Sequence, residues 1–136
     1  MSRRSRAREV ALQVLYQDDL NPGQSAHREE AFLKSRLRGD AENMAFARAI
    51  VSGVREKRTE IDAALAARAT NWSLSRMAAT DRNVLRLGAW EVLYSGAPAA
   101  VAIDEAIELA KRYGDRRSPS FVNGILDRIS RQDRGE

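Results

Sequence analysis

Cysteine is absent from this 136-residue chain, and histidine occurs once, at position 27. Disulfides, thiol chemistry and zinc sites of the usual ligand types are therefore excluded, and we expect no metal or cofactor. No apolar run approaches the roughly 20 residues that cross a bilayer, and no apolar stretch follows the N-terminal arginines as in a signal peptide. These absences fit a cytoplasmic protein with no membrane partner.

Catalytic motifs are missing as well. The chain has neither a glycine-rich phosphate loop nor a nucleophile elbow. Asp104 and Glu108 share a helix face, but Glu108 precedes Lys111 and Arg112 at the spacing of ordinary surface ion pairs. We interpret these carboxylates as surface groups and expect no enzymatic activity.

Positive charge is present in two clusters, although the net charge is only +4. The clusters comprise Arg3, Arg4, Arg6 and Arg8 near the start, and Lys111, Arg112, Arg116 and Arg117 near the end. Local positive charge favours phosphate binding, because neutralising phosphates releases condensed counterions. Solvated arginines that keep the protein soluble are an equally good interpretation from charge alone.

Helical periodicity runs through the whole chain. Apolar residues recur at helical spacing in seven segments, at about 4–20, 26–38, 40–57, 59–69, 80–92, 98–114 and 118–129. Residues 72–77 read as a connector with one helical turn. No alternating run indicates a strand. With 43% hydrophobic and 31% charged residues, we predict a soluble all-α fold of about seven helices in one domain, residues 1–136.

Several residues mark the expected helix ends. We expect the first helix to end at Asn21-Pro22-Gly23. Thr59 and Thr80 are the expected N-caps of the fourth and fifth helices. Pro98 is the expected first residue of the sixth helix and Gly114 its left-handed C-cap, and Ser118-Pro119 are the expected N-cap and first-turn residue of the last helix.

Three segments resemble, in order, motifs of the NusB family of transcription antitermination factors. The opening helix of that family is similar to RRSRAREVALQVLYQ (3–17), and its central motif is similar to WSLSRMAATDRNVLRLGAWE (72–91). Its C-terminal signature resembles IDEAIELAKRYG followed by S-x-x-FVNGILD (103–127), and IVSGV (50–54) is a weaker match. The resemblance covers more than half of the chain.

The resemblance implies an all-helical, non-enzymatic fold of two small helical bundles packed together. It also implies binding of boxA RNA together with NusE, a small-subunit ribosomal protein, in a complex delivered to RNA polymerase. RNA contact is thereby assigned to Arg3, Arg4, Arg6 and Arg8, with Gln13 beside them. Arg116 and Arg117 depart from the family pattern, and we weigh phosphate contact and simple solvation equally for this pair.

The NusE surface implied by the resemblance lies on the central motif and the C-terminal helices. Its expected residues are Tyr16, Asp81, Arg82, Tyr113, Phe121 and Asn123. Aromatic residues dominate binding hot spots, but core packing is an equally good interpretation of Phe121, and half-buried packing of Tyr16. Gly124 inside the last helix costs about 1 kcal/mol relative to alanine, which the close approach of another helix or of a partner would explain.

Three alternatives remain at this point. The same helical domain occurs as the RNA-binding part of ribosomal RNA cytosine methyltransferases, but this chain ends at position 136 without a cysteine nucleophile. A helix-turn-helix DNA-binding protein would use residues 118–131 as its reading helix, although a dense base-reading polar face is missing. A homodimer that hides one of the two surfaces is the third.

Overall fold

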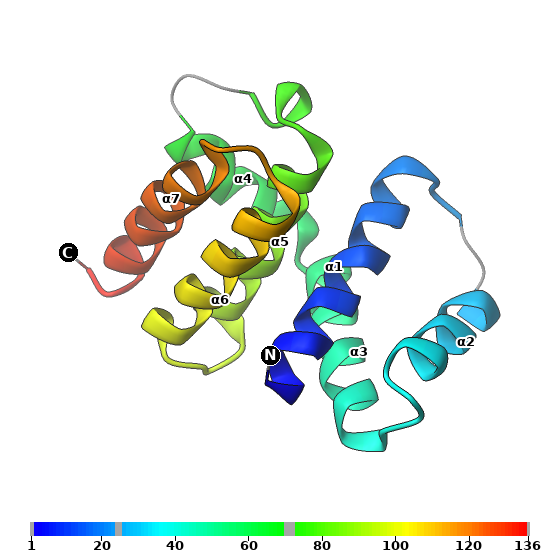
Figure 1. Cartoon of the computed structure of the whole chain (residues 1–136). Coiled ribbons are helices and arrows are strands. Elements are labelled where there is room, and N and C mark those ends of the chain that lie inside the picture. Colours follow the sequence, from blue (N-terminus) through cyan, green and yellow to red (C-terminus); the bar gives the residue numbers. More distant parts are fainter. Residues whose placement is uncertain (1, 24–25, 70–72, 136) are drawn as a thin grey trace. The chain divides into compact units, whose positions relative to one another are not determined.

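The computed structural model describes residues 2–23, 26–69 and 73–135 (Figure 1). All regular structure within these ranges is helical, which confirms the all-α prediction. The chain divides into two compact units, Met1–Ser52 and Gly53–Glu136. None of the helices described combines the length and hydrophobicity that crossing a membrane requires. Trp72, which opens the expected connector, lies outside the described residues.

The first unit contains α1 (Arg3–Leu20), α2 (Ala26–Arg36) and most of α3 (Ala41–Glu56). The Ser2 hydroxyl caps α1 by accepting a hydrogen bond from the Ser5 N–H at 3.0 Å. The apolar stripe expected on α1 is buried, and its members are Ala7, Val10, Ala11, Val14 and Leu15. Leu33 of α2 and Ile50 of α3 are buried too. Burial of these faces supplies the main stabilisation of the unit.

Helix α2 ends two residues earlier than the periodicity predicts. Arg38 and Gly39 both have positive φ, at 55° and 70°, and the Gly39 N–H donates to the Lys34 carbonyl at 2.9 Å. This is the hydrogen bond of a Schellman C-cap. Asp40 then opens α3, because its Oδ1 accepts a hydrogen bond from the Asn43 N–H at 3.0 Å.

The second unit contains α4 (Arg58–Arg68), the 3₁₀ turn η1 (Leu74–Arg76), α5 (Ala79–Tyr94), α6 (Ala99–Tyr113) and α7 (Ser118–Asp133). Helices α5, α6 and α7 pack against one another, and α4 packs on α5 and α7. The turn η1 confirms the single helical turn expected in the connector.

At Gly88, α5 closely approaches both α6 and α7. A Cβ atom there would lie 2.6 Å from Leu126 Cδ1 on α7 and 3.2 Å from Ala106 Cβ on α6. Leu126 and Ala106 are themselves fully buried, so neither has free space into which to retreat. The missing side chain therefore sets how closely the three helices can pack.

An ion pair between the buried Arg86 and the half-buried Asp62 joins α5 to α4. The Arg86 guanidinium, in a residue only 4% exposed, donates to Asp62 Oδ1 at 2.8 Å and Oδ2 at 3.1 Å. The Asn83 side chain accepts a further hydrogen bond from Arg86 at 3.2 Å. Such a bidentate pair fixes the register between the two helices because both oxygens and both donors must align.

Four of the expected helix boundaries are wrong by one or two residues. Thr59 and Thr80 lie inside their helices, because the carbonyls of Lys57 and Ala78 already accept the first helical hydrogen bonds. Pro98 is the N-cap of α6 and not its first residue. Ser118 likewise begins α7 after the N-cap Arg117, and its hydroxyl accepts a hydrogen bond from the Asp115 N–H at 2.9 Å.

The two glycines singled out near the end of the chain have other roles than expected. Gly114 has extended backbone (φ −93°, ψ −170°), so the left-handed cap is wrong. A Cβ atom there would meet Ser118 Oγ at 2.3 Å, which explains the glycine. At Gly124 no described atom comes within 4 Å of the Cβ position, so the close approach of another helix is wrong.

Substituting alanine at two of the interior helical glycines, Gly88 and Gly124, should change stability in opposite directions. Gly88→Ala is expected to lower the free energy of unfolding by about 1–3 kcal/mol, because the added methyl group overpacks the helix contact. Gly124→Ala is the matched control and should raise it by about 0.5–1 kcal/mol, because only the helix propensity changes. Urea unfolding followed by circular dichroism measures both; a stable Gly88→Ala protein would contradict the packing described here.

Candidate nucleic-acid interface

The first candidate surface is the arginine cluster, Arg3, Arg4, Arg6 and Arg8, on the first two turns of α1. Arg3 and Arg4 are exposed and Arg6 is half-buried, whereas Arg8 is only 5% exposed. No acidic residue occupies the first turn of this helix. The arginines therefore face the positive end of the helix dipole, where cations are unfavourable unless other groups compensate them.

Carboxylates compensate two of these arginines. Arg3 Nη2 lies 2.6 Å from Asp40 Oδ2 and 3.8 Å from Glu42 Oε2, both at the start of α3. Arg6 pairs with the Glu9 carboxylate, whose side chain is buried. The sequence gives no sign that Asp40 is the partner of Arg3, because the two residues are 37 positions apart. The pairing of Arg6 with Glu9 was accessible, because the two are three residues apart on one helix.

The aromatic ring of Phe46 lies close to the other two arginines, Arg4 and Arg8. The guanidinium carbon of Arg4 lies 4.6 Å from the centroid of the Phe46 ring, and that of Arg8 lies 5.1 Å from it. Phe46 belongs to α3 and is half-buried. Both distances are within the range of cation–π attraction. Nothing in the sequence pattern singled out Phe46, because its position relative to α1 depends on the packing of the two helices.

Gln13 and Tyr16 lie further along α1 and are both half-buried. Gln13 Oε1 is buried without a hydrogen-bond partner among the described residues. An acceptor left in this state is costly, so a donor from a ligand at this position would be favourable. The partial burial of Tyr16 agrees with the packing interpretation as well as with a contact role.

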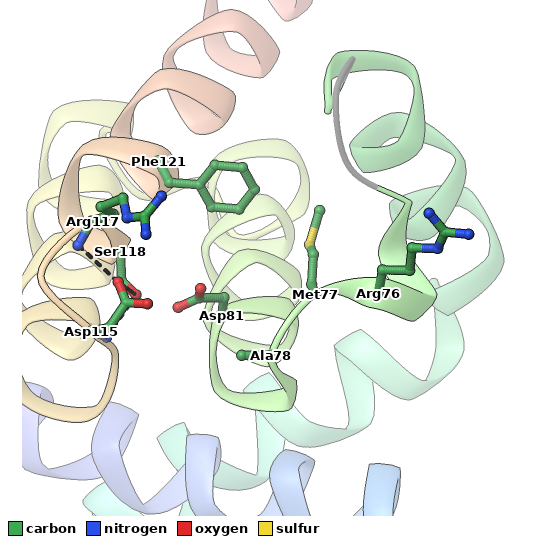
Figure 2. A pocket seen from close by; sticks show the side chains of 8 residues that line it. All are labelled: Arg76, Met77, Ala78, Asp81, Asp115, Arg117, Ser118 and Phe121. Carbon is green, nitrogen blue, oxygen red and sulfur yellow. Dashed lines mark hydrogen bonds between the residues drawn. The ribbon is translucent and has the colours of Figure 1, made fainter.

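The second candidate surface is a hollow in the second unit, with a volume of about 240 Å³. Figure 2 shows its lining, which comes from the end of η1 and the connector after it, the start of α5, the α6–α7 turn and the start of α7. The lining residues are Arg76, Met77, Ala78, Asp81, Asp115, Arg117, Ser118 and Phe121. We call this the α5–α7 hollow.

The hollow combines apolar and charged groups. Phe121 is half-buried and borders it, so Phe121 is neither fully in the core nor fully exposed. Asp81 lies in the first turn of α5, and its Oδ1 is buried without a hydrogen-bond partner among the described residues. Arg76 and Arg117 add positive charge, whereas Asp115 is already bound by the Arg117 N–H at 2.8 Å.

Arg82 fixes the connector that borders this hollow. Its Nη1 donates to the carbonyls of Leu74 at 2.9 Å and Met77 at 3.1 Å, and so holds the connector against α5. Of the other expected contact residues, Tyr113 is half-buried, and Arg116 and Asn123 are exposed. None of these three lines the hollow.

The structure thus brings Asp81 and Phe121, two of the predicted NusE contacts, together with Arg117, which was predicted as an RNA contact. The residues that sequence reasoning missed are Arg76, Met77, Ala78, Asp115 and Ser118. Arg76 and Met77 belong to the central motif and precede Asp81 closely, so the motif itself was a usable signal. No group of three or more metal-ligating side chains occurs in residues 2–23, 26–69 and 73–135.

Comparison with known proteins gives consistent results. The model of the NusB family matches residues 5–131. The chain is 50% identical over 131 residues to the transcription antitermination protein NusB of Sorangium cellulosum, covering 96% of this chain and 93% of the relative. It is 47% identical over 129 residues to the protein of the same name from Anaeromyxobacter dehalogenans, covering 95% and 91%.

Solved structures agree with the sequence comparison. The structure of NusB from T. maritima has 38% identity and a TM-score of 0.85, covering 97% of this chain and 92% of that one. A complex of antitermination factors NusB and NusE with dsRNA has 26% identity and a TM-score of 0.85, covering 97% and 98%. The resemblance found in the sequence is confirmed.

Acid should weaken the ion pair that joins α1 to α3. The Asn43 N–H and then the Arg3 guanidinium hold the pKa of Asp40 below its ordinary value of 3.8, and Asp40 in turn raises the pKa of Arg3. A lowered folded-state pKa stabilises the fold above pH 3.8, and this stabilisation is lost as the pH falls through the lowered value.

Arg3→Gln is therefore expected to raise the pKa of Asp40 towards 3.8 without reaching it, because the Asn43 hydrogen bond remains. A carboxyl ¹³C NMR titration measures this pKa. Arg48→Gln is the matched control, since Arg48 pairs with Glu30 at 3.0 Å and does not touch Asp40. An Asp40 pKa that is the same in both variants would contradict the ion pair.

Proposed function

Because the chain belongs to the NusB family, we propose that it binds boxA-type single-stranded RNA of ribosomal RNA transcripts together with NusE. In this role the protein is a non-catalytic cytoplasmic adaptor for RNA polymerase antitermination complexes. The solved complex of NusB and NusE with dsRNA, similar over 97% of this chain, supports NusE and RNA as the two classes of partner. The arrangement of the arginine cluster is the observation that carries the RNA half of the proposal.

Backbone phosphates are the expected ligands of this cluster. Arg3 and Arg4 are exposed, and the contacts with Asp40 and Phe46 restrict how far each guanidinium can move. Arginine presents planar donors that suit phosphate oxygens, and a strand that replaces counterions along its backbone gains affinity. Arg6 is half-buried beside them, and the burial of Arg8 favours a supporting role over a direct phosphate contact.

The α5–α7 hollow is the proposed contact for NusE. Phe121 offers a half-buried aromatic ring to a partner, and the buried Met77 adds an apolar group to the lining of the hollow. The unpaired Asp81 Oδ1 is an acceptor that a partner's N–H or cationic group would satisfy. The open space at Gly124 on the same helix leaves room for a partner's backbone. Tyr16, Tyr113 and Asn123 remain predicted NusE contacts, and Arg116 remains a predicted RNA contact.

The mechanism is assembly and not turnover. Two weak associations, RNA with this protein and NusE with this protein, reinforce each other because each binding partner raises the effective concentration of the next. The two curated relatives are spanned over 93% and 91% of their own lengths, and both are antitermination proteins by name. This favours the adaptor over the methyltransferase and the helix-turn-helix alternatives.

Removing two exposed arginines should weaken RNA binding and its dependence on salt. For Arg3→Ala/Arg4→Ala, we expect the slope of log K against log salt to flatten by about 0.7 for each phosphate that the variant no longer neutralises. Fluorescence anisotropy with a boxA RNA at several salt concentrations measures both quantities. Arg36→Ala/Arg131→Ala removes the same charge from exposed helix ends and should leave the slope unchanged. Equal slopes in the two double variants would remove the arginine cluster from the site.

RNA and NusE should raise each other's affinity by the same factor, as linkage requires. Phe121→Ala is expected to weaken NusE binding by about tenfold or more, whereas the exposed aromatic control Tyr94→Ala should have no effect. Calorimetric titrations with RNA first and with NusE first measure the factor by which each partner raises the affinity for the other. Sedimentation of the free protein tests whether it forms a homodimer. An RNA affinity that is equal with and without NusE would contradict the adaptor mechanism.

A further inference from the structure

We propose that Phe46 is a positioning residue of the RNA-binding surface, whose ring holds the exposed guanidinium of Arg4 in place for phosphate and lies against the buried, supporting Arg8. This inference rests on the proposed RNA-binding function and adds to it a residue from another helix. It follows from the placement of two cationic groups, from successive turns of α1, over one aromatic ring of α3 at 4.6 and 5.1 Å.

Two like charges on neighbouring turns need a reason to stay together. Arg4 and Arg8 are four residues apart on one helix face, where like charges repel. Arg4 also lies in the first turn of α1, where the helix dipole disfavours cations. The negative face of an aromatic ring attracts both guanidinium groups and offsets these two penalties.

An aromatic ring and a carboxylate differ in how much of an arginine's charge and hydrogen-bonding capacity they leave available to a ligand. Asp40 and Glu9 neutralise the formal charge of Arg3 and Arg6 through ion pairs, and a phosphate must compete with those carboxylates for the same N–H donors. Phe46 orients a guanidinium without neutralising it or occupying its in-plane donors. Arg4 is exposed, so its charge remains available to a strand that approaches α1.

Orientation before binding also lowers the entropic cost of the complex. A long arginine side chain that is immobilised only when RNA arrives loses rotamer freedom at that moment. A guanidinium already stacked on a half-buried ring loses less. The ring therefore contributes to RNA affinity without touching the RNA, and any substitution that keeps an aromatic face at position 46 should keep this contribution.

The experiment compares substitutions at position 46 that differ in having a ring. Phe46→Leu and Phe46→Met keep an apolar side chain but have no ring, whereas Phe46→Tyr keeps the ring. We expect the two ringless variants to bind boxA RNA about three- to tenfold more weakly at low salt, and Phe46→Tyr to bind within about twofold of the wild type. Ring-current shifts of the Arg4 and Arg8 Cδ protons in the free protein should be lost only in the ringless variants.

Urea unfolding identifies any variant that fails to fold. Because Leu and Met differ in shape, the comparison can still be made with the second variant if the first does not fold. Ringless variants that fold and bind RNA as tightly as the wild type would overturn the inference, as would a Phe46→Tyr protein as weak as Phe46→Leu. Failure of the wild type to prefer boxA RNA over a scrambled strand would instead overturn the proposed function.

Discussion

The close packing of α5 against α6 and α7 at Gly88 is the constraint on which the second unit depends. A side chain at this position would intrude on Leu126 and Ala106, so the distance between α5 and α7 is set by the absence of a single methyl group. Asp81 and Phe121 sit near the starts of these two helices and border the same hollow. The shape of the candidate partner surface therefore follows from a packing contact in the core.

Electrostatics organises the first unit in a comparable way. Four arginines lie near the start of α1, and positive charge at the N-terminal end of a helix destabilises the helix. The structure shows that α3 and Glu9 supply the compensation, with Asp40 and Glu42 for Arg3 and Phe46 for Arg4. The cluster is a set of groups held in place by their neighbours, which suits a rigid anion-binding surface better than freely moving side chains would.

The number and order of the helices could be predicted because amphipathic periodicity is a local property. The helix ends were less accessible, because a threonine or serine near a boundary satisfies the same pattern one residue earlier or later. Glycine was the most ambiguous residue type. Gly114 makes room for Ser118, Gly88 makes room for Leu126, and Gly124 faces open space. A glycine in a sequence does not say which of these reasons applies.

Local pattern and composition decided the all-helical class, the absence of thiol chemistry and the position of the basic clusters. The family followed from the resemblance of three motifs, each made of residues close together in the chain. Tertiary packing decided which groups lie close together. It places Arg3 beside Asp40 and Arg4 beside Phe46, and it brings Asp81 and Phe121 to the same hollow. These contacts join residues that are far apart in the chain. The register between two packed helices selects them, and that register depends on how all the buried side chains fit together.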